Sequence, residues 1–131
     1  MVYGHINDKR VIEEWIKSNY KIEVKLTISD DFVVDCSGGV AVYNKSIESL
    51  TNGLFRWGKV MGNFSCGECM NLISLKGAPE EVGGGFWCNH CDKLETLEGA
   101  PEKIGFDLNW YGCKKLKITD SDRKKYIIHI I

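Results

Sequence analysis

The chain has 131 residues, of which 44% are hydrophobic and 27% are charged, as in an ordinary globular domain. This length predicts a single domain, residues 1–131, and a net charge of −1 predicts no general attraction to nucleic acid or anionic membranes. No apolar run reaches the roughly 20 residues that cross a bilayer, and the polar stretch from His5 to Arg10 argues against a signal peptide. Six cysteines without such a signal indicate free or metal-bound thiols, and we expect a reducing compartment, the cytoplasm.

The N-terminal part of the chain predicts a helix followed by a strand. Asn7 or Asp8 can cap a helix that runs to Asn19, with apolar residues at helical spacing within it. From Ile22 to Ile28, apolar and polar residues alternate, which predicts a half-buried strand. We expect residues 1–30 to form the N-terminal cap of a repeat protein, because the end of such a protein otherwise exposes its core.

The next part of the chain predicts a short strand and an early, divergent repeat. The strand runs from Val33 to Cys36 between turn residues, and the repeat covers Val40 to Leu50. The segment from Thr51 to Lys59 is interpreted as a connection. Its aromatic residues, Phe55 and Trp57, are expected to seal the convex side of the repeats, with an exposed functional tip as the alternative.

The centre of the chain is an internal repeat in which Phe64 and Phe86 stand 22 residues apart. Phe-Ser-Cys-Gly-Glu-Cys-Met-Asn-Leu, from Phe64, returns as Phe-Trp-Cys-Asn-His-Cys-Asp-Lys-Leu, from Phe86, and in weaker form from Leu108. Between these copies, Leu-Lys-Gly-Ala-Pro-Glu-Glu-Val-Gly at 75–83 recurs as a similar linker at 97–105. A fixed period of this size predicts stacked units that share one core.

The repeat fits the spacing L-x-x-L-x-L-x-x-C-x-x-L. Its apolar positions are filled by Phe64, Cys66, Cys69 and Leu72, and again by Phe86, Cys88, Cys91 and Leu94. Residues 28–116 thus resemble the short leucine-rich-repeat-like proteins of bacteria and large bacteriophages, which carry a similar S-L-x-G-A-P-E-x-V-G-G linker. The resemblance implies an α/β repeat fold: a right-handed solenoid with a parallel sheet, an N-terminal helical cap and rungs over residues 31–118.

The resemblance also implies a bacterial or bacteriophage protein that binds another protein in the cytoplasm, which is the host cytoplasm if a phage encodes it. For a phage protein, inhibition of a host defence or regulatory protein is the expected role. We expect no enzymatic activity, because the motifs supply no Ser-His-Asp or Cys-His arrangement, nucleophile elbow or phosphate loop.

The two Cys-x-x-Cys pairs allow three interpretations, and a redox pair is the least expected of them, because neither pair opens a helix of a βαβ unit. Cys66, Cys69, Cys88 and Cys91 have the spacing of a four-cysteine zinc site. However, these cysteines fall on inward positions of the repeat, where a free cysteine packs as a small hydrophobe, and Trp110 replaces the first of them in the third copy. We favour a packed core without a cofactor. The alternative is a zinc-stabilised module that contacts nucleic acid.

Strand alternation predicts an exposed face, because the neighbours of inward residues point outward. On this face, Tyr43, Ser65, Trp87 and Asn109 are expected to form one lateral row. Trp and Tyr are enriched in protein interfaces, so we expect this face to bind a protein. The alternative is that a terminal segment of the same chain covers Trp87. The full predicted binding set is Tyr43, Asn63, Ser65, Trp87, Asn89, Asp107, Asn109 and Tyr111.

The chain ends on an apolar run from Tyr126 to Ile131, in which His129 is the polar exception. Its β-branched residues favour an extended strand over a helix. We expect residues 119–131 to form a C-terminal cap over the last rung. The alternative is pairing with the same run of a second chain. The predicted oligomeric state is therefore a monomer, or a homodimer through the C-terminal end.

Overall fold

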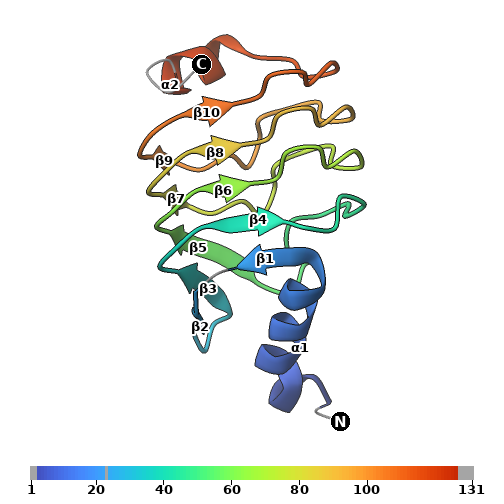
Figure 1. Cartoon of the computed structure of the whole chain (residues 1–131), viewed down its shortest axis with the longest axis vertical. Coiled ribbons are helices and arrows are strands. Elements are labelled where there is room, and N and C mark those ends of the chain that lie inside the picture. The colour runs from blue at the N-terminus through green and yellow to red at the C-terminus, as the bar shows by residue number, and fades with distance from the viewer. Residues whose placement is uncertain (1–2, 23, 127–131) are drawn as a thin grey trace.

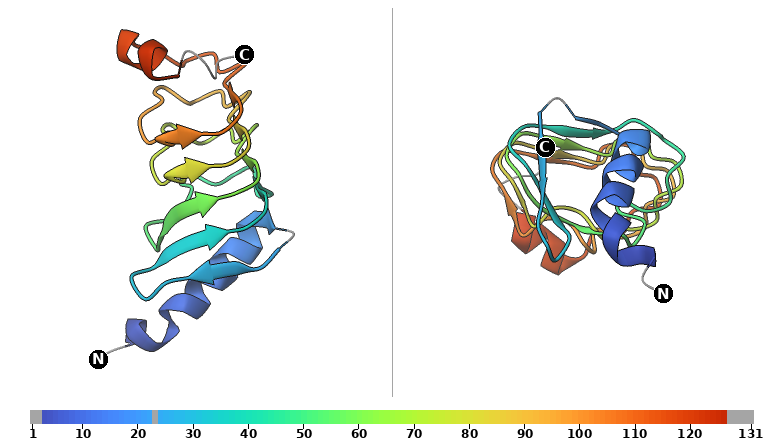
Figure 2. Two further views of the ribbon diagram at one scale, coloured as in Figure 1. Left: turned by 90° about the vertical axis from the view of Figure 1, so that its left-hand side faces the viewer. Right: turned by 90° about the horizontal axis from the view of Figure 1, so that it is seen from below.

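The computed structural model describes the backbone of residues 3–22 and 24–126, and the side chains of residues 9–22 and 24–126. Its elements are α1 (Tyr3–Asn19), β1 (Tyr20–Ile22), β2 (Leu26–Ile28), β3 (Val33–Cys36), β4 (Val40–Val42), β5 (Arg56–Val60), β6 (Phe64–Ser65), β7 (Glu81–Val82), β8 (Phe86–Trp87), β9 (Lys103–Ile104), β10 (Leu108–Asn109) and α2 (Asp120–Tyr126). They form a β-solenoid of about four turns with parallel sheets, with α1 at one end and α2 at the other (Figures 1 and 2).

The solenoid has two five-stranded sheets, where the sequence predicts one. The first sheet has the strand order β1-β4-β6-β8-β10, and the second has the order β2-β3-β5-β7-β9. In each sheet the first strand is antiparallel to its neighbour and the remaining pairs are parallel. Each turn therefore contributes one short strand to each sheet, and the apolar residues of both sheets face a common core between them.

The repeated apolar residues set the register of the first sheet. Val40 pairs with Phe64, Phe64 with Phe86, and Phe86 with Leu108. The rings of Phe64 and Phe86 stack with centroids 5.5 Å apart and planes inclined by 10°. All of these side chains are buried. The early repeat is thus confirmed, and Val40 occupies in it the position that Phe64 has in the next rung.

The repeated linkers build the second sheet. Gly77 and Gly99 adopt φ of 90° and 95°, a left-handed conformation that favours glycine. The turns close where Ala78 N–H donates to Leu75 O at 3.0 Å and, one repeat later, Ala100 N–H donates to the corresponding carbonyl at 2.9 Å. Strands β7 and β9 follow these turns. The sequence predicts these residues as parts of linkers, because each strand follows directly on a Gly-Ala-Pro-Glu turn.

The segment from Thr51 to Lys59 is more than the connection that the sequence predicts, because β5 begins within it. Phe55 and Trp57 are 7% and 1% exposed, and their rings lie 5.2 Å apart. The interpretation of this segment as a linker is therefore wrong. Its two aromatic residues belong to the core, beside Tyr20 of β1.

The N-terminal helix is confirmed with its end at Asn19, but it begins at Tyr3, so the predicted cap at Asn7 or Asp8 is wrong because both residues lie within the helix. The single strand predicted from Ile22 to Ile28 is also wrong. This stretch is divided between β1, which pairs with β4, and β2, which pairs with β3. The alternation of apolar and polar residues continues across the point where the chain passes from one sheet to the other, so the pattern alone does not reveal the break. Ile12 and Ile16 of α1 are buried against this end of the core.

At the other end, α2 is a helix that the sequence does not predict. Thr119 Oγ accepts a hydrogen bond from Asp122 N–H, and Asp122 Oδ2 accepts one from Thr119 N–H, both at 3.0 Å. This reciprocal capping satisfies N–H groups at the helix start. Tyr126 is buried, and its hydroxyl donates to Pro101 O at 3.0 Å. The rest of the apolar run, 127–131, lies outside the described residues. In the described part of the chain, neither helix is long and apolar enough to cross a bilayer.

Candidate functional site

The first sheet aligns the outward residues of successive rungs. Ser65 pairs with Trp87, and Trp87 pairs with Asn109, as the predicted row requires. The place of Tyr43 in this row is wrong, because Ala41 pairs with Ser65. The offset that aligns Val40 with Phe64 already implies this register. Lys21 of β1, which the sequence prediction missed, pairs with Ala41 and extends the row.

We call this surface the Trp87 face. It consists of the row Lys21, Ala41, Ser65, Trp87 and Asn109, together with the flanking residues Tyr43, Asn63, Asn89, Asp107 and Tyr111. The predicted residues thus share one side of the first sheet, with Tyr43 displaced from the row by two positions along its strand.

Trp87 is half-buried and is held by a residue of the next rung. Its indole Nε1 donates to Oδ1 and Oδ2 of Asp107, at 3.1 Å each. The indole lies over Gly85, where an added Cβ would come within 2.5 Å of Nε1. Within the described residues, Trp87 is therefore held by Asp107, a residue of the neighbouring rung.

Two of the three asparagines of the Trp87 face, Asn63 and Asn109, accept hydrogen bonds from the backbone. Asn63 Oδ1 accepts Gly85 N–H at 2.8 Å, and Asn109 Oδ1 accepts Tyr111 N–H at 2.9 Å. Each bond ties an amide side chain to a defined position. The polar groups of this face are therefore oriented by the rungs themselves.

Two tyrosines project from one side of the face. Tyr43 is 73% exposed and Tyr111 is 72% exposed. The ring of Tyr111 meets the imidazole of His90 edge-on, with centroids 5.4 Å apart. His90 is exposed and has a left-handed φ of 56° in the bend after β8.

A depression of about 260 Å³ lies between Trp87 and Lys21. It is lined by Lys21, Gly39, Val40, Ala41, Asn63, Ser65 and Trp87. The depression forms because the small side chains of Ala41 and Ser65 lie between the long side chains of Lys21 and Trp87. A larger hollow of about 600 Å³ lies between α1, β1 and β2 and shares Lys21 with the Trp87 face.

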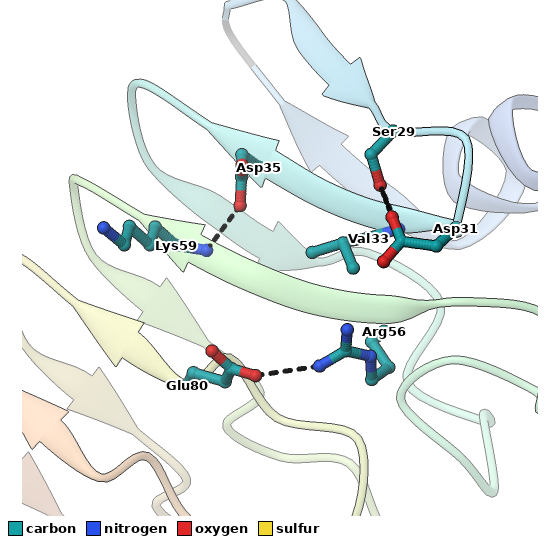
Figure 3. Close-up of polar contacts among 7 residues, drawn as sticks. All are labelled: Ser29, Asp31, Val33, Asp35, Arg56, Lys59 and Glu80. Carbon is teal, nitrogen blue, oxygen red and sulfur yellow. Dashed lines mark hydrogen bonds and ion pairs between the residues drawn. The ribbon is translucent and has the colours of Figure 1, made fainter.

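The outer face of the second sheet has a different character, shown in Figure 3. Asp35 Oδ1 accepts Lys59 N–H at 2.7 Å, and Arg56 forms an ion pair with Glu80 at 2.8 Å. Five charged residues lie in the strands of this sheet: Asp35, Arg56, Lys59, Glu81 and Lys103. The strands of the first sheet contain one, Lys21.

The predicted core positions of the two Cys-x-x-Cys pairs are confirmed. Cys66, Cys69, Cys88 and Cys91 are free and have no exposed surface. Burial raises the pKa of the Cys66 thiol well above its ordinary value and that of Cys69 to about 11. Within residues 9–22 and 24–126, no group of three or more His, Cys, Asp or Glu side chains is arranged to hold a metal ion. That the protein has no cofactor stays a prediction.

Comparison of the chain with protein-family models, curated proteins and solved structures finds no match. The resemblance to leucine-rich-repeat-like proteins therefore rests on the repeat spacing and the linker sequence.

Proposed function

We propose that the protein is a non-catalytic binding module that recognises another protein through the Trp87 face. The observation that carries this proposal is the contrast between the two sheets of the same solenoid. The second sheet presents alternating charges with an ion pair between rungs, Arg56 with Glu80, which is ordinary solvated surface. The first presents Trp87, Tyr43 and Tyr111 among small and amide side chains, with Lys21 and Asp107 as the charged residues of the Trp87 face.

This composition suits a protein interface, where aromatic residues are enriched and charged residues are depleted at the centre. The hydrogen bonds of Trp87 and Asn109 orient these side chains before a partner arrives, which lowers the entropic cost of binding. The depression between Trp87 and Lys21 offers a place for a side chain of the partner. Exposed tyrosines at one side extend the contact area.

The finer assignment follows from the sequence resemblance. We propose a leucine-rich-repeat-like protein of a bacterium or bacteriophage that acts in the cytoplasm, with α1 and the segment from residue 119 onward as end caps. In a phage, its role would be to bind and inhibit a host protein, such as one of host defence.

Site-specific photo-crosslinking in bacterial lysate tests the proposal. A photoreactive amino acid replaces Asn109, on the Trp87 face, or Lys103, on the outer face of the second sheet in the same turn of the solenoid. We expect a defined crosslinked protein from the first position, identified by mass spectrometry, and none from the second. Crosslinks to the same protein at Lys103 alone would contradict the proposal.

The affinity of the purified partner then provides the quantitative test. Trp87→Ala should weaken binding at least about 30-fold, which corresponds to the ~2 kcal/mol typical of an interface hot spot. Lys59→Ala, on the opposite sheet, serves as the matched control and should bind like the parent protein. Thermal melting of Trp87→Ala must remain close to that of the parent, because a large loss would mean that Trp87 acts mainly in the core.

A further inference from the structure

The second cysteine of each repeat forms a column that runs up the solenoid. Cys69, Cys91 and Cys113 occupy equivalent positions in three successive rungs. The hydrogen-bond ladder continues up to these positions, because His90 N–H donates to Tyr111 O at 2.7 Å. Neighbouring parallel strands are about 4.8 Å apart. Successive cysteines of the column are therefore at a spacing that suits a disulfide, for which Cα atoms lie about 4.4–6.8 Å apart.

The three cysteines differ in their access to solvent. Cys69 and Cys91 have no exposed surface, whereas Cys113 is partly exposed in the last rung. All six cysteines belong to the described part of the chain, and Cys113 is the one among them that is not buried. A dissolved oxidant therefore reaches Cys113 before any other thiol.

Thiols of the previous rung surround Cys113. Its Sγ donates to Cys88 O at 3.0 Å, repeating the bond of Cys91 Sγ to Cys66 O at 3.2 Å. The thiols of Cys88 and Cys91 also lie within hydrogen-bonding reach of the Cys113 sulfur, and as donors they lower the pKa of the Cys113 thiol. The accessible thiol thus has a second thiol beside it.

We propose that Cys113 is an oxidation site, at which a hydroperoxide produces a disulfide between Cys113 and Cys91. In the first step the Cys113 thiolate attacks the O–O bond of the hydroperoxide. It becomes a sulfenic acid and releases the alcohol, or water in the case of hydrogen peroxide, after protonation of the leaving oxygen. In the second step the Cys91 sulfur displaces the sulfenic hydroxyl. The S–S bond forms and water leaves with the thiol proton.

Cys91 is the expected partner because it is the register equivalent of Cys113, directly beneath it in the column. Cys88 lies three residues earlier in its rung, so its Cα is displaced along the chain as well as by one rung. The pair Cys69 and Cys91 has the same register, but no solvent reaches either thiol. The pair Cys69 and Cys91 is therefore an internal control for the pair Cys91 and Cys113, because the two pairs have the same register and differ in exposure to solvent.

Peptide mapping of the full chain tests the proposal. The reduced protein, freed of metal with a chelator, is treated with an equivalent of hydrogen peroxide. Residual peroxide is removed with catalase, and the protein is then unfolded in guanidinium chloride, blocked with N-ethylmaleimide and digested without reductant. We expect a crosslinked peptide containing Cys91 and Cys113, lighter by two hydrogens than its parts, while Cys66 and Cys69 carry the blocking group. A crosslink of Cys69 to Cys91, of Cys88 to Cys113, or between two chains would overturn the assignment, as would Cys113 left reduced.

Variants separate the two steps. Cys113→Ser should abolish the crosslink and leave every remaining cysteine reduced. Cys91→Ser should stop the reaction at the sulfenic acid of Cys113, which dimedone traps as an adduct visible by mass spectrometry. Cys69→Ser is the matched control and should give the parental crosslink. If Cys91→Ser does not fold, as judged by circular dichroism, dimedone added during oxidation of the parent protein should compete with the crosslink. A crosslink yield unaffected by dimedone would contradict a sulfenic intermediate.

Discussion

The indole Nε1 of Trp87 lies 3.1 Å from each carboxylate oxygen of Asp107, although the two residues are 20 positions apart in the sequence. One rung thus fixes the most prominent aromatic side chain of the rung before it. The orientation of Trp87 on this face therefore depends on the stacking of adjacent rungs.

Asp107→Ala should free the indole without unfolding the protein. The loss of both acceptors should accelerate hydrogen exchange of the Trp87 indole N–H, measured by NMR with assignment through Trp87→Phe. The change in stability should stay within about 0.5–1.5 kcal/mol, the net contribution of a partly exposed hydrogen bond. Asp107→Asn retains one acceptor and is the control. Equal exchange rates in the parent and Asp107→Ala would show that the bond is not formed in solution.

Gly85→Ala should displace Trp87. A Cβ at this position would overlap Asp107 Oδ1 and lie 2.5 Å from the indole Nε1. We expect a loss of about 1–3 kcal/mol, as for other overpacked sites, measured by urea unfolding. Gly39→Ala is the matched control: Gly39 lies in the equivalent column, where a Cβ meets Asn63 O at 3.3 Å. Gly39→Ala should therefore cost less, and the opposite order would contradict the packing described for the indole.

The bends after the first-sheet strands predict that glycine is the favoured residue at two equivalent positions. Glu68 and Gly112 have left-handed φ of 62° and 81°. Glu68→Gly should relieve a strain of about 1–2 kcal/mol, partly offset by the entropy of glycine, for a net gain near 0.5 kcal/mol. Gly112→Ala should destabilise the protein by about 2 kcal/mol, since its Cβ would also overlap the His90 ring. Chemical denaturation checks both, and a stabilising Gly112→Ala would contradict the geometry of this bend.

Tyr126 should contribute strongly to stability from the C-terminal end. It is 4% exposed, and its hydroxyl donates to Pro101 O at 3.0 Å. Tyr126→Phe should cost about 1 kcal/mol for the hydrogen bond, and Tyr126→Ala about 3–5 kcal/mol for the lost ring. Thermal and urea unfolding should show the larger loss of stability for Tyr126→Ala and the smaller one for Tyr126→Phe.

Deletion of the whole run from Tyr126 to Ile131 should cause aggregation or a large loss of stability, because the last rung would lose its cover. Light scattering and size-exclusion chromatography provide the measurement. A truncated protein that stays monomeric and equally stable would show that this run covers nothing.

The buried cysteines should act through packing. Cys66→Ala or Cys88→Ala should each cost roughly 1–2 kcal/mol, as expected when a buried side chain is shortened. The purified protein should contain less than one zinc per chain and keep its circular dichroism spectrum in a strong chelator. One tightly held zinc per chain, with unfolding on its removal, would instead support the zinc-stabilised module.

The repeat period is the part of the fold that the sequence reveals most directly. Apolar residues at equal spacing, such as Phe64 and Phe86, can share a core only by stacking, so the period fixes both the solenoid and the register of its first sheet. Strand β3 is likewise predicted with the bounds that the structure shows. In the same way, the neighbours Ser65, Trp87 and Asn109 follow from strand alternation.

What the sequence does not reveal depends on contacts between distant segments. Strand Glu81–Val82 lies in a linker that turn residues dominate, and its hydrogen bonds to the neighbouring rungs define it as a strand. The polar helix α2 has a local signal, Thr119 with Asp122 three residues later, which its lack of apolar spacing obscures. The bond between Trp87 and Asp107 also arises only when adjacent rungs stack.

The equal register of successive rungs has a consequence for engineering. Phe64 to Phe86 and Phe86 to Leu108 are identical steps in the first sheet, as Val60 to Val82 and Val82 to Ile104 are in the second. A duplicate of residues 84–105, inserted after residue 105, would therefore begin and end at matching points of the chain. It would lengthen the molecule by one rung, about 4.8 Å, and add a second tryptophan to the row. The length of the solenoid and the number of tryptophans in the row can therefore both be set by copying one segment.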